Sequence, residues 1–137
     1  MTLNAYPSTN GMFPDLEIKV MELVAQGNYS AYTICVIAWD DTNKYFTATQ
    51  TANALPTGNC CVIQKATTTS DRKTWGIVRG ETSTATDLSG VASLAAGERV
   101  QSAASGAFAR ASAVTNRTLG IVTDLVNDKV YFDGLQK

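Results

Sequence analysis

In this 137-residue chain, the acidic residues are the ones whose type and spacing could support catalysis or metal binding. Asp40 and Asp41 are adjacent, and Asp124, Asp128 and Asp133 gather near the end of the chain. Paired carboxylates can hydrolyse glycosides or bind calcium. Each of these aspartates stands where a turn between strands is predicted, and aspartate is favoured in turns because its side chain bonds the nearby backbone. We therefore interpret them as turn residues.

Other catalytic and ligand-binding motifs are missing from the sequence. The chain contains no histidine, which excludes Ser-His-Asp and Cys-His nucleophile systems and imidazole metal ligands. Neither of the common glycine-rich phosphate-binding motifs occurs. The sequence therefore predicts a protein that is not an enzyme, with no catalytic residues, no cofactor and no metal.

The three cysteines are interpreted as free thiols. Cys35 lies in an apolar run, which is typical of a small core residue. Cys60 and Cys61 are adjacent, and neighbouring strand residues point to opposite faces of a sheet. None of the three has a CxxC spacing, so a zinc site is not expected.

Composition narrows the class of partner. Only 17% of residues are charged and the formal net charge is −1, so the chain has no basic field for a nucleic-acid backbone. The N-terminus has no signal-peptide pattern, and the most apolar stretch, residues 31–39, is far shorter than a membrane helix. We expect a soluble protein that is made in a cytoplasm and contacts neither membrane nor nucleic acid.

The strand pattern predicts one β-rich domain over residues 16–137, preceded by an extended arm over residues 1–15. The arm holds prolines and scattered apolar residues without a period. The domain is expected to be all-β, or mostly β with at most one or two short helices, and to form a small barrel or sandwich. Predicted strands cover residues 16–20, 32–39, 44–49, 60–65, 75–81, 97–101, 107–111, 119–124 and 129–132. Two alternatives stay open: a short helix in place of the first strand, and another between residues 88 and 94.

Aromatic residues within these strands admit two interpretations. Trp39, Tyr45, Phe46, Trp75, Tyr131 and Phe132 stand beside isoleucine and valine, which favours core packing. The alternative is a platform on which sugar rings stack. Many hydroxyl side chains and few charges also suit large neutral protein contacts, because charged groups are costly to desolvate.

Two stretches of the sequence resemble tailed-phage capsid decoration (cement) proteins, including the lambda-type head decoration protein. The first is Val36-Ile37-Ala38-Trp39-Asp40-Asp41, followed by Tyr45-Phe46 and Trp75-Gly76-Ile77-Val78. The second is Gly90-Val91-Ala92, then Ala96-Gly97-Glu98-Arg99-Val100, Ser105-Gly106-Ala107-Phe108 and Leu119-Gly120-Ile121-Val122. The resemblance covers about residues 30–135.

This resemblance implies a structural virion protein, made in the host cytoplasm, that cements the outside of a capsid by bridging major capsid protein subunits. It also implies a homo-oligomer, with a trimer favoured, and an N-terminal arm that orders on the shell. For that arm we expect shell contacts from Leu3, Tyr6, Pro7, Met12 and Phe13. A carbohydrate-binding or tail-fibre-like β module that uses Trp39 or Trp75 is the alternative function.

Overall fold

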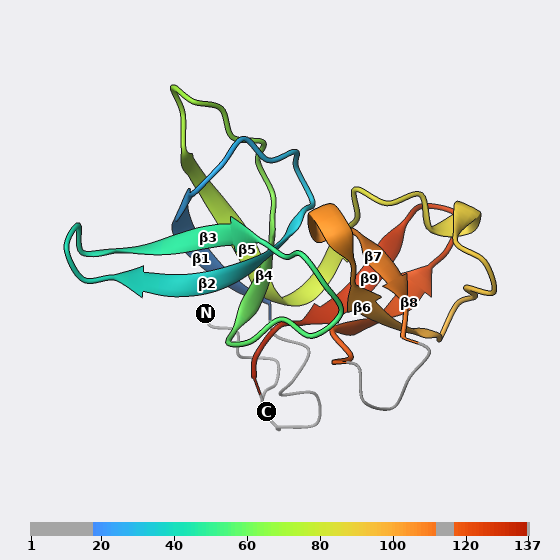
Figure 1. Ribbon diagram of the computed structural model, residues 1–137. Coiled ribbons are helices and arrows are strands. Elements are labelled where there is room, and N and C mark those ends of the chain that lie inside the picture. The colour runs from blue at the N-terminus through green and yellow to red at the C-terminus, as the bar shows by residue number, and fades with distance from the viewer. Residues whose placement is uncertain (1–17, 112–116, 137) are drawn as a thin grey trace, which may run out of the picture.

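The computed structural model describes residues 18–111 and 117–136, and nearly all of its regular structure is β (Figure 1). Its strands are β1 (Lys19–Ala25), β2 (Ile34–Asp40), β3 (Tyr45–Gln50), β4 (Cys60–Ile63), β5 (Lys73–Ser83), β6 (Arg99–Ser102), β7 (Phe108–Arg110), β8 (Gly120–Asp124) and β9 (Lys129–Asp133). Two single-turn 3-10 helices, η3 (Leu88–Gly90) and η4 (Ala104–Gly106), complete the described elements. The predicted all-β class is confirmed.

The first five strands close a small barrel. Neighbouring strands follow the order β1-β3-β2-β4-β5, and β5 pairs back onto β1. The closing pair is antiparallel and runs from Lys19 opposite Arg79 to Val24 opposite Lys73. Of the two architectures that the sequence left open, barrel and sandwich, the structure therefore has the barrel.

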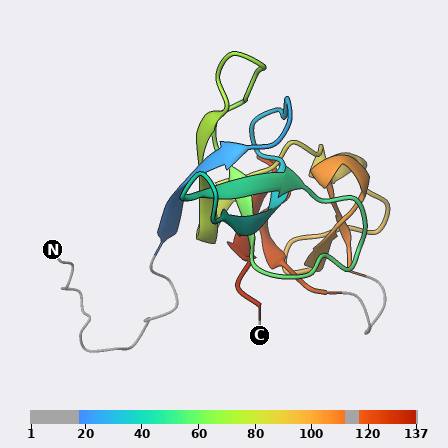
Figure 2. The same cartoon turned by 60° about the vertical axis from the view of Figure 1, so that its left-hand side comes forward.

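The remaining strands extend the same sheet beyond the barrel. β5 is 11 residues long, and its second half leaves the barrel to pair with β9. β8, β6 and β7 follow β9 in that order. In both views these later strands lie to one side of the barrel (Figures 1 and 2). The β2–β3 hairpin points away from them in Figure 1.

Two hydrophobic cores lie on the two faces of β4. Cys61 and Ile63 belong to the barrel core, whereas Cys60 and Val62 belong to the core that the barrel shares with β6–β9. All four residues of β4 are buried. The barrel core consists of Leu23, Cys35, Ala48, Cys61, Ile63 and Val78. The shared core consists of Ile34, Cys60, Val62, Leu88, Leu94, Val100, Phe108, Leu119, Val122, Val130 and Phe132.

The three cysteines are free thiols, as expected, and Cys60 and Cys61 are buried like Cys35, for which alone a core position was predicted. Burial raises the pKa of the Cys35 thiol to about 12, and it also raises the pKa of Cys61 well above the ordinary value. Burial raises the pKa of Cys60 too, although the nearby Arg117 guanidinium opposes this shift. The three thiols therefore hold their protons at neutral pH, a state in which sulfur is a poor nucleophile and a poor metal ligand.

The structure decides both alternatives that the sequence left open: the first element is the strand that was favoured over a helix, and only a short helical turn forms between residues 88 and 94. Residues 21–25 continue β1 as a strand, with Leu23 and Ala25 facing the barrel core. Between residues 88 and 94 only η3 is helical, and Asp87 caps it by accepting a hydrogen bond from the Ser89 backbone. The predicted arm, residues 1–15, lies outside the described residues.

Candidate functional site

The aspartates singled out by the sequence hold turns. Asp40 accepts hydrogen bonds from the backbone of Thr42 and Asn43 and from the Asn43 side chain, each at 3.0 Å. These bonds, with the Asn43 side chain first, lower the pKa of the Asp40 carboxyl. Asp124 accepts the equivalent two bonds from Asn127, which lower its pKa in the same way. The interpretation of both residues as turn residues is confirmed.

The remaining two C-terminal aspartates hold other segments in place. Asp128 accepts a 2.8 Å bond from the backbone of Leu88, and so it ties the β8–β9 turn to η3. Asp133 forms a 3.3 Å ion pair with Arg79 on the neighbouring strand. Among residues 18–111 and 117–136, no three cysteine, histidine or acidic residues are grouped so that they could hold a metal ion.

Residues 39–46 form the outer end of the β2–β3 hairpin, here called the finger. Within the sheet, the finger strands pair only with each other: β2 meets β4 no farther than Val36, and β3 meets β1 no earlier than Thr47. Trp39 and Phe46 stand directly opposite, with ring centroids 4.9 Å apart in an edge-to-face contact. Trp39 is still 50% exposed and Phe46 41% exposed. The finger therefore presents an aromatic pair to solvent.

A second apolar surface runs along β1 and β5, and we call it the β1–β5 face. It comprises Ile18, Val20 and Trp75, and Trp75 is 45% exposed. The register places Val20 opposite Ile77 and Glu22 opposite Trp75, so these side chains share the outer side of the barrel. Exposed apolar side chains in such a group are typical of interaction surfaces.

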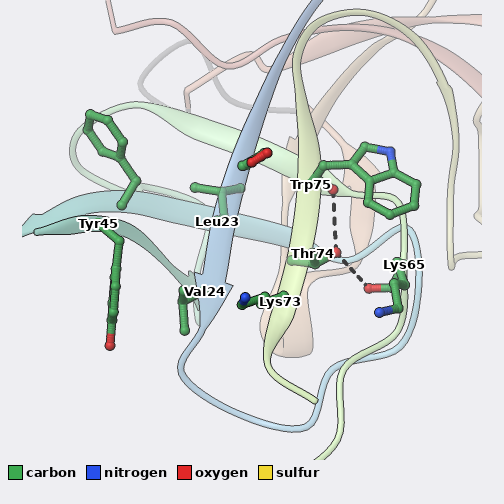
Figure 3. A pocket seen from close by; sticks show the side chains of 9 residues that line it. Leu23, Val24, Tyr45, Lys65, Lys73, Thr74 and Trp75 are labelled. Carbon is green, nitrogen blue, oxygen red and sulfur yellow. Dashed lines mark hydrogen bonds between the residues drawn. The ribbon is translucent and has the colours of Figure 1, made fainter. Parts of the chain in front are cut away.

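An open pocket of about 450 Å³ lies where β1 and β3 separate (Figure 3). The two strands pair in parallel only at Val24–Thr47 and Ala25–Ala48, so the earlier part of β1 has no partner on its β3 side. We call this opening the β1–β3 pocket. Its lining consists of Glu22, Leu23, Val24, Tyr45, Phe46, Lys65, Lys73, Thr74 and Trp75.

The lining of the β1–β3 pocket combines aromatic rings with two lysines. Figure 3 shows Tyr45 on one side of β1, and Trp75 and Lys65 on the other. Thr74 fixes the Lys65 backbone by donating a 2.9 Å bond to its carbonyl, and the Lys65 ammonium forms a 2.7 Å ion pair with Asp71. The arrangement offers aromatic rings to an aromatic or apolar group, and the charge of Lys65 is already balanced by Asp71.

The core interpretation of the aromatic residues is correct only in part. Phe132 is fully buried and packs edge-to-face on Phe108. Trp39, Phe46 and Trp75 are exposed, so the prediction is wrong for them. The turn at residues 40–44 could have shown that Trp39 and Phe46 are cross-strand neighbours, but no local pattern reveals that the hairpin continues past the barrel.

The five expected shell-contact residues, Leu3, Tyr6, Pro7, Met12 and Phe13, lie outside the described residues. Their arm joins the described chain at Ile18, which is the first residue of the β1–β5 face.

No protein-family model matches the chain, and no curated protein matches it significantly. In the described part of the chain, no helix has the length and apolar character needed to cross a bilayer.

Proposed function

We propose that this chain is a structural virion protein that binds the outer surface of a tailed-phage capsid and cements the shell. In this proposal each copy bridges neighbouring major capsid protein subunits, and copies associate, with a trimer favoured. The chain stabilises the shell through its contacts with the capsid subunits, and the proposal involves no catalysis, cofactor or nucleic acid. The resemblance of residues 36–78 and 90–122 to decoration proteins is the reason for proposing this family.

The observation that carries the proposal is the β1–β5 face at the root of the N-terminal arm. Ile18 and Val20 are each more than half exposed, and Trp75, 45% exposed, lies on β5, the strand that pairs with β1. With only 17% charged residues in the chain, contact at such a surface desolvates few charges. An arm and a face that bind one shell together also gain from effective concentration, because the second contact becomes intramolecular.

Deletion of residues 2–13 tests the anchoring role of the arm. The deletion removes Leu3, Tyr6, Pro7, Met12 and Phe13 and leaves every described residue in place. Full burial of one large apolar side chain contributes about 1.5–3 kcal/mol, so the loss of several contacts should weaken shell binding by at least about 100-fold. The measurement is co-sedimentation with shells assembled from the coat protein that is encoded beside this chain's gene.

Thermal melting of the truncated and full-length chains is the control, and both should melt at the same temperature. Full binding by the truncated chain would show that the arm is not the anchor. If the full-length chain itself does not sediment with shells, the decoration function is wrong.

The exposed tryptophans favour one alternative, a carbohydrate-binding or tail-fibre-like module. An exposed indole face is suited to stack on the apolar face of a sugar ring, and Trp39 and Trp75 are both available for this. The decoration proposal predicts no hits on a glycan array. Hits that disappear in Trp39→Ala or Trp75→Ala variants would instead establish the carbohydrate function.

A further inference from the structure

One row of four side chains crosses the outer face of the sheet outside the barrel. The register places Glu81 on β5 opposite Tyr131 on β9. It also places Tyr131 opposite Ile121 on β8, and Ile121 opposite Arg99 on β6. The residue that follows each of the four in sequence is buried, so the four side chains point to the opposite side of the sheet. We call these four residues the cross-strand row.

The cross-strand row is acidic at one end, apolar in the middle and basic at the other end. Glu81 and Arg99 are exposed, and Ile121 between them is 46% exposed. Glu81 accepts a 2.9 Å hydrogen bond from the Thr123 hydroxyl, which leaves its charge unbalanced. Within residues 18–111 and 117–136, neither Glu81 nor Arg99 forms an ion pair.

The other charged side chains around the row already have partners. Arg79 forms a 3.3 Å ion pair with Asp133 on the neighbouring strand. Lys129 stands opposite Asp124, and its charge helps to lower the pKa of that carboxyl. The two ends of the cross-strand row are therefore the charges that a partner on this face would pair.

We propose that a second copy of this chain packs on the cross-strand row, related by a two-fold axis that runs along the strands between β8 and β9. This rotation reverses the order of the row, so that Glu81 meets Arg99 of the second copy and Tyr131 meets its Ile121. A two-fold axis along the row would instead place Glu81 against Glu81, which like charges oppose. Packed sheets lie about 10 Å apart, a spacing at which the side chains of the two layers interdigitate.

The resulting contact has an apolar centre and a charged rim, which is the usual anatomy of a protein interface. It is isologous, so each end of the row is paired once in each direction. The inference concerns the self-association part of the proposed function and adds a pairwise contact to it. A trimer needs a different contact, so the expected assemblies are a dimer or a hexamer made of two trimers.

Charge reversal tests the contact by sedimentation velocity from about 10 to about 500 μM. We expect the unaltered chain to form an assembly with an even number of copies as its concentration rises. Glu81→Lys and Arg99→Glu should each weaken association at least about tenfold, because a two-fold contact then holds like charges at both ends of the row. The double variant, and an equal mixture of the two single variants, should recover most of the association. Ile121→Lys should also weaken it, and the double charge reversal should not rescue this variant.

Glu22→Lys is the matched control, because it makes the same charge change as Glu81→Lys at an exposed position of β1, outside the row. This control should associate like the unaltered chain. All variants should melt like the unaltered chain at about 1 μM, where mass action favours the monomer.

A chain that stays monomeric, an assembly with an odd number of copies, or association that neither single variant weakens would overturn the inference. Shell co-sedimentation of the unaltered chain is measured in parallel and tests the proposed function separately. Shell binding by a chain that fails the association test would overturn the pairwise contact and leave the decoration proposal standing.

Discussion

Replacement of Arg117 by methionine is expected to lower the free energy of unfolding by about 3 kcal/mol. The guanidinium donates to the carbonyl oxygens of Pro56 at 3.1 Å and Gly134 at 2.9 Å, and also to that of Gly58. It further contacts the Cys60 sulfur at 3.6 Å. One side chain thus joins the loop before β4 to the segment that follows β9.

The expected loss is large because methionine fills similar space but removes the charged donor from the carbonyls of Pro56 and Gly58, while the Gly134 carbonyl keeps only the Cys60 amide. An unsatisfied buried polar group costs about 1–3 kcal/mol, and hydrogen bonds to charged groups are the stronger ones. Urea denaturation followed by tryptophan fluorescence measures the effect. The free energy of unfolding of Arg117→Lys should lie between those of the unaltered chain and Arg117→Met. A lysine keeps the charge, but it cannot reach the same acceptors with a planar guanidinium fork.

Arg99→Met is the matched control, because Arg99 is an exposed arginine on β6. Its cost should stay within about 0.5 kcal/mol, as for most surface substitutions. Equal stability of the Arg117 and Arg99 variants would mean that strand pairing alone holds the loop and the C-terminal segment.

The strands were predictable because β-branched and aromatic residues mark them and turn residues separate them. β1 was the hard case, since its apolar residues face both ways: Leu23 points into the barrel core while Val20 lies on the β1–β5 face. An apolar residue on each side of a strand removes the alternation on which the strand prediction depends. A helix was therefore a reasonable alternative, and barrel closure by β5 decided against it.

The exposed aromatics could not be predicted from local sequence. Whether Trp75 is buried depends on where the strands of the second half of the chain pack against the barrel. Their core covers Val62 on β4 but does not reach Trp75 on β5. Burial of β4 on both faces has the same origin, because strands from the second half of the chain pack on its outer side. Pairing between β1 and β5 joins residues about fifty to sixty positions apart, which local patterns do not encode.

Substitution of Gly106 by alanine is expected to cost at least about 3 kcal/mol, with two separable causes. Gly106 has a φ of 67°, which is unfavourable for a residue with a side chain. In addition, an added Cβ would lie 2.7 Å from the Ile34 carbonyl oxygen and would overlap the Thr33 methyl group. Gly106 is thus the residue at which η4 packs against the start of β2. Its backbone amide donates a 3.0 Å hydrogen bond to the carbonyl oxygen of Thr51.

Gly97→Ala separates the two causes. Gly97 has a φ of 87°, yet an added Cβ would meet nothing within 4 Å. Alanine there should cost only the conformational term, about 1–2 kcal/mol. The difference between the two variants in urea denaturation then measures how tightly η4 is packed on the barrel. Equal losses would show that β2 and η4 move apart without cost, and that close packing at Gly106 does not fix the second half of the chain to the barrel.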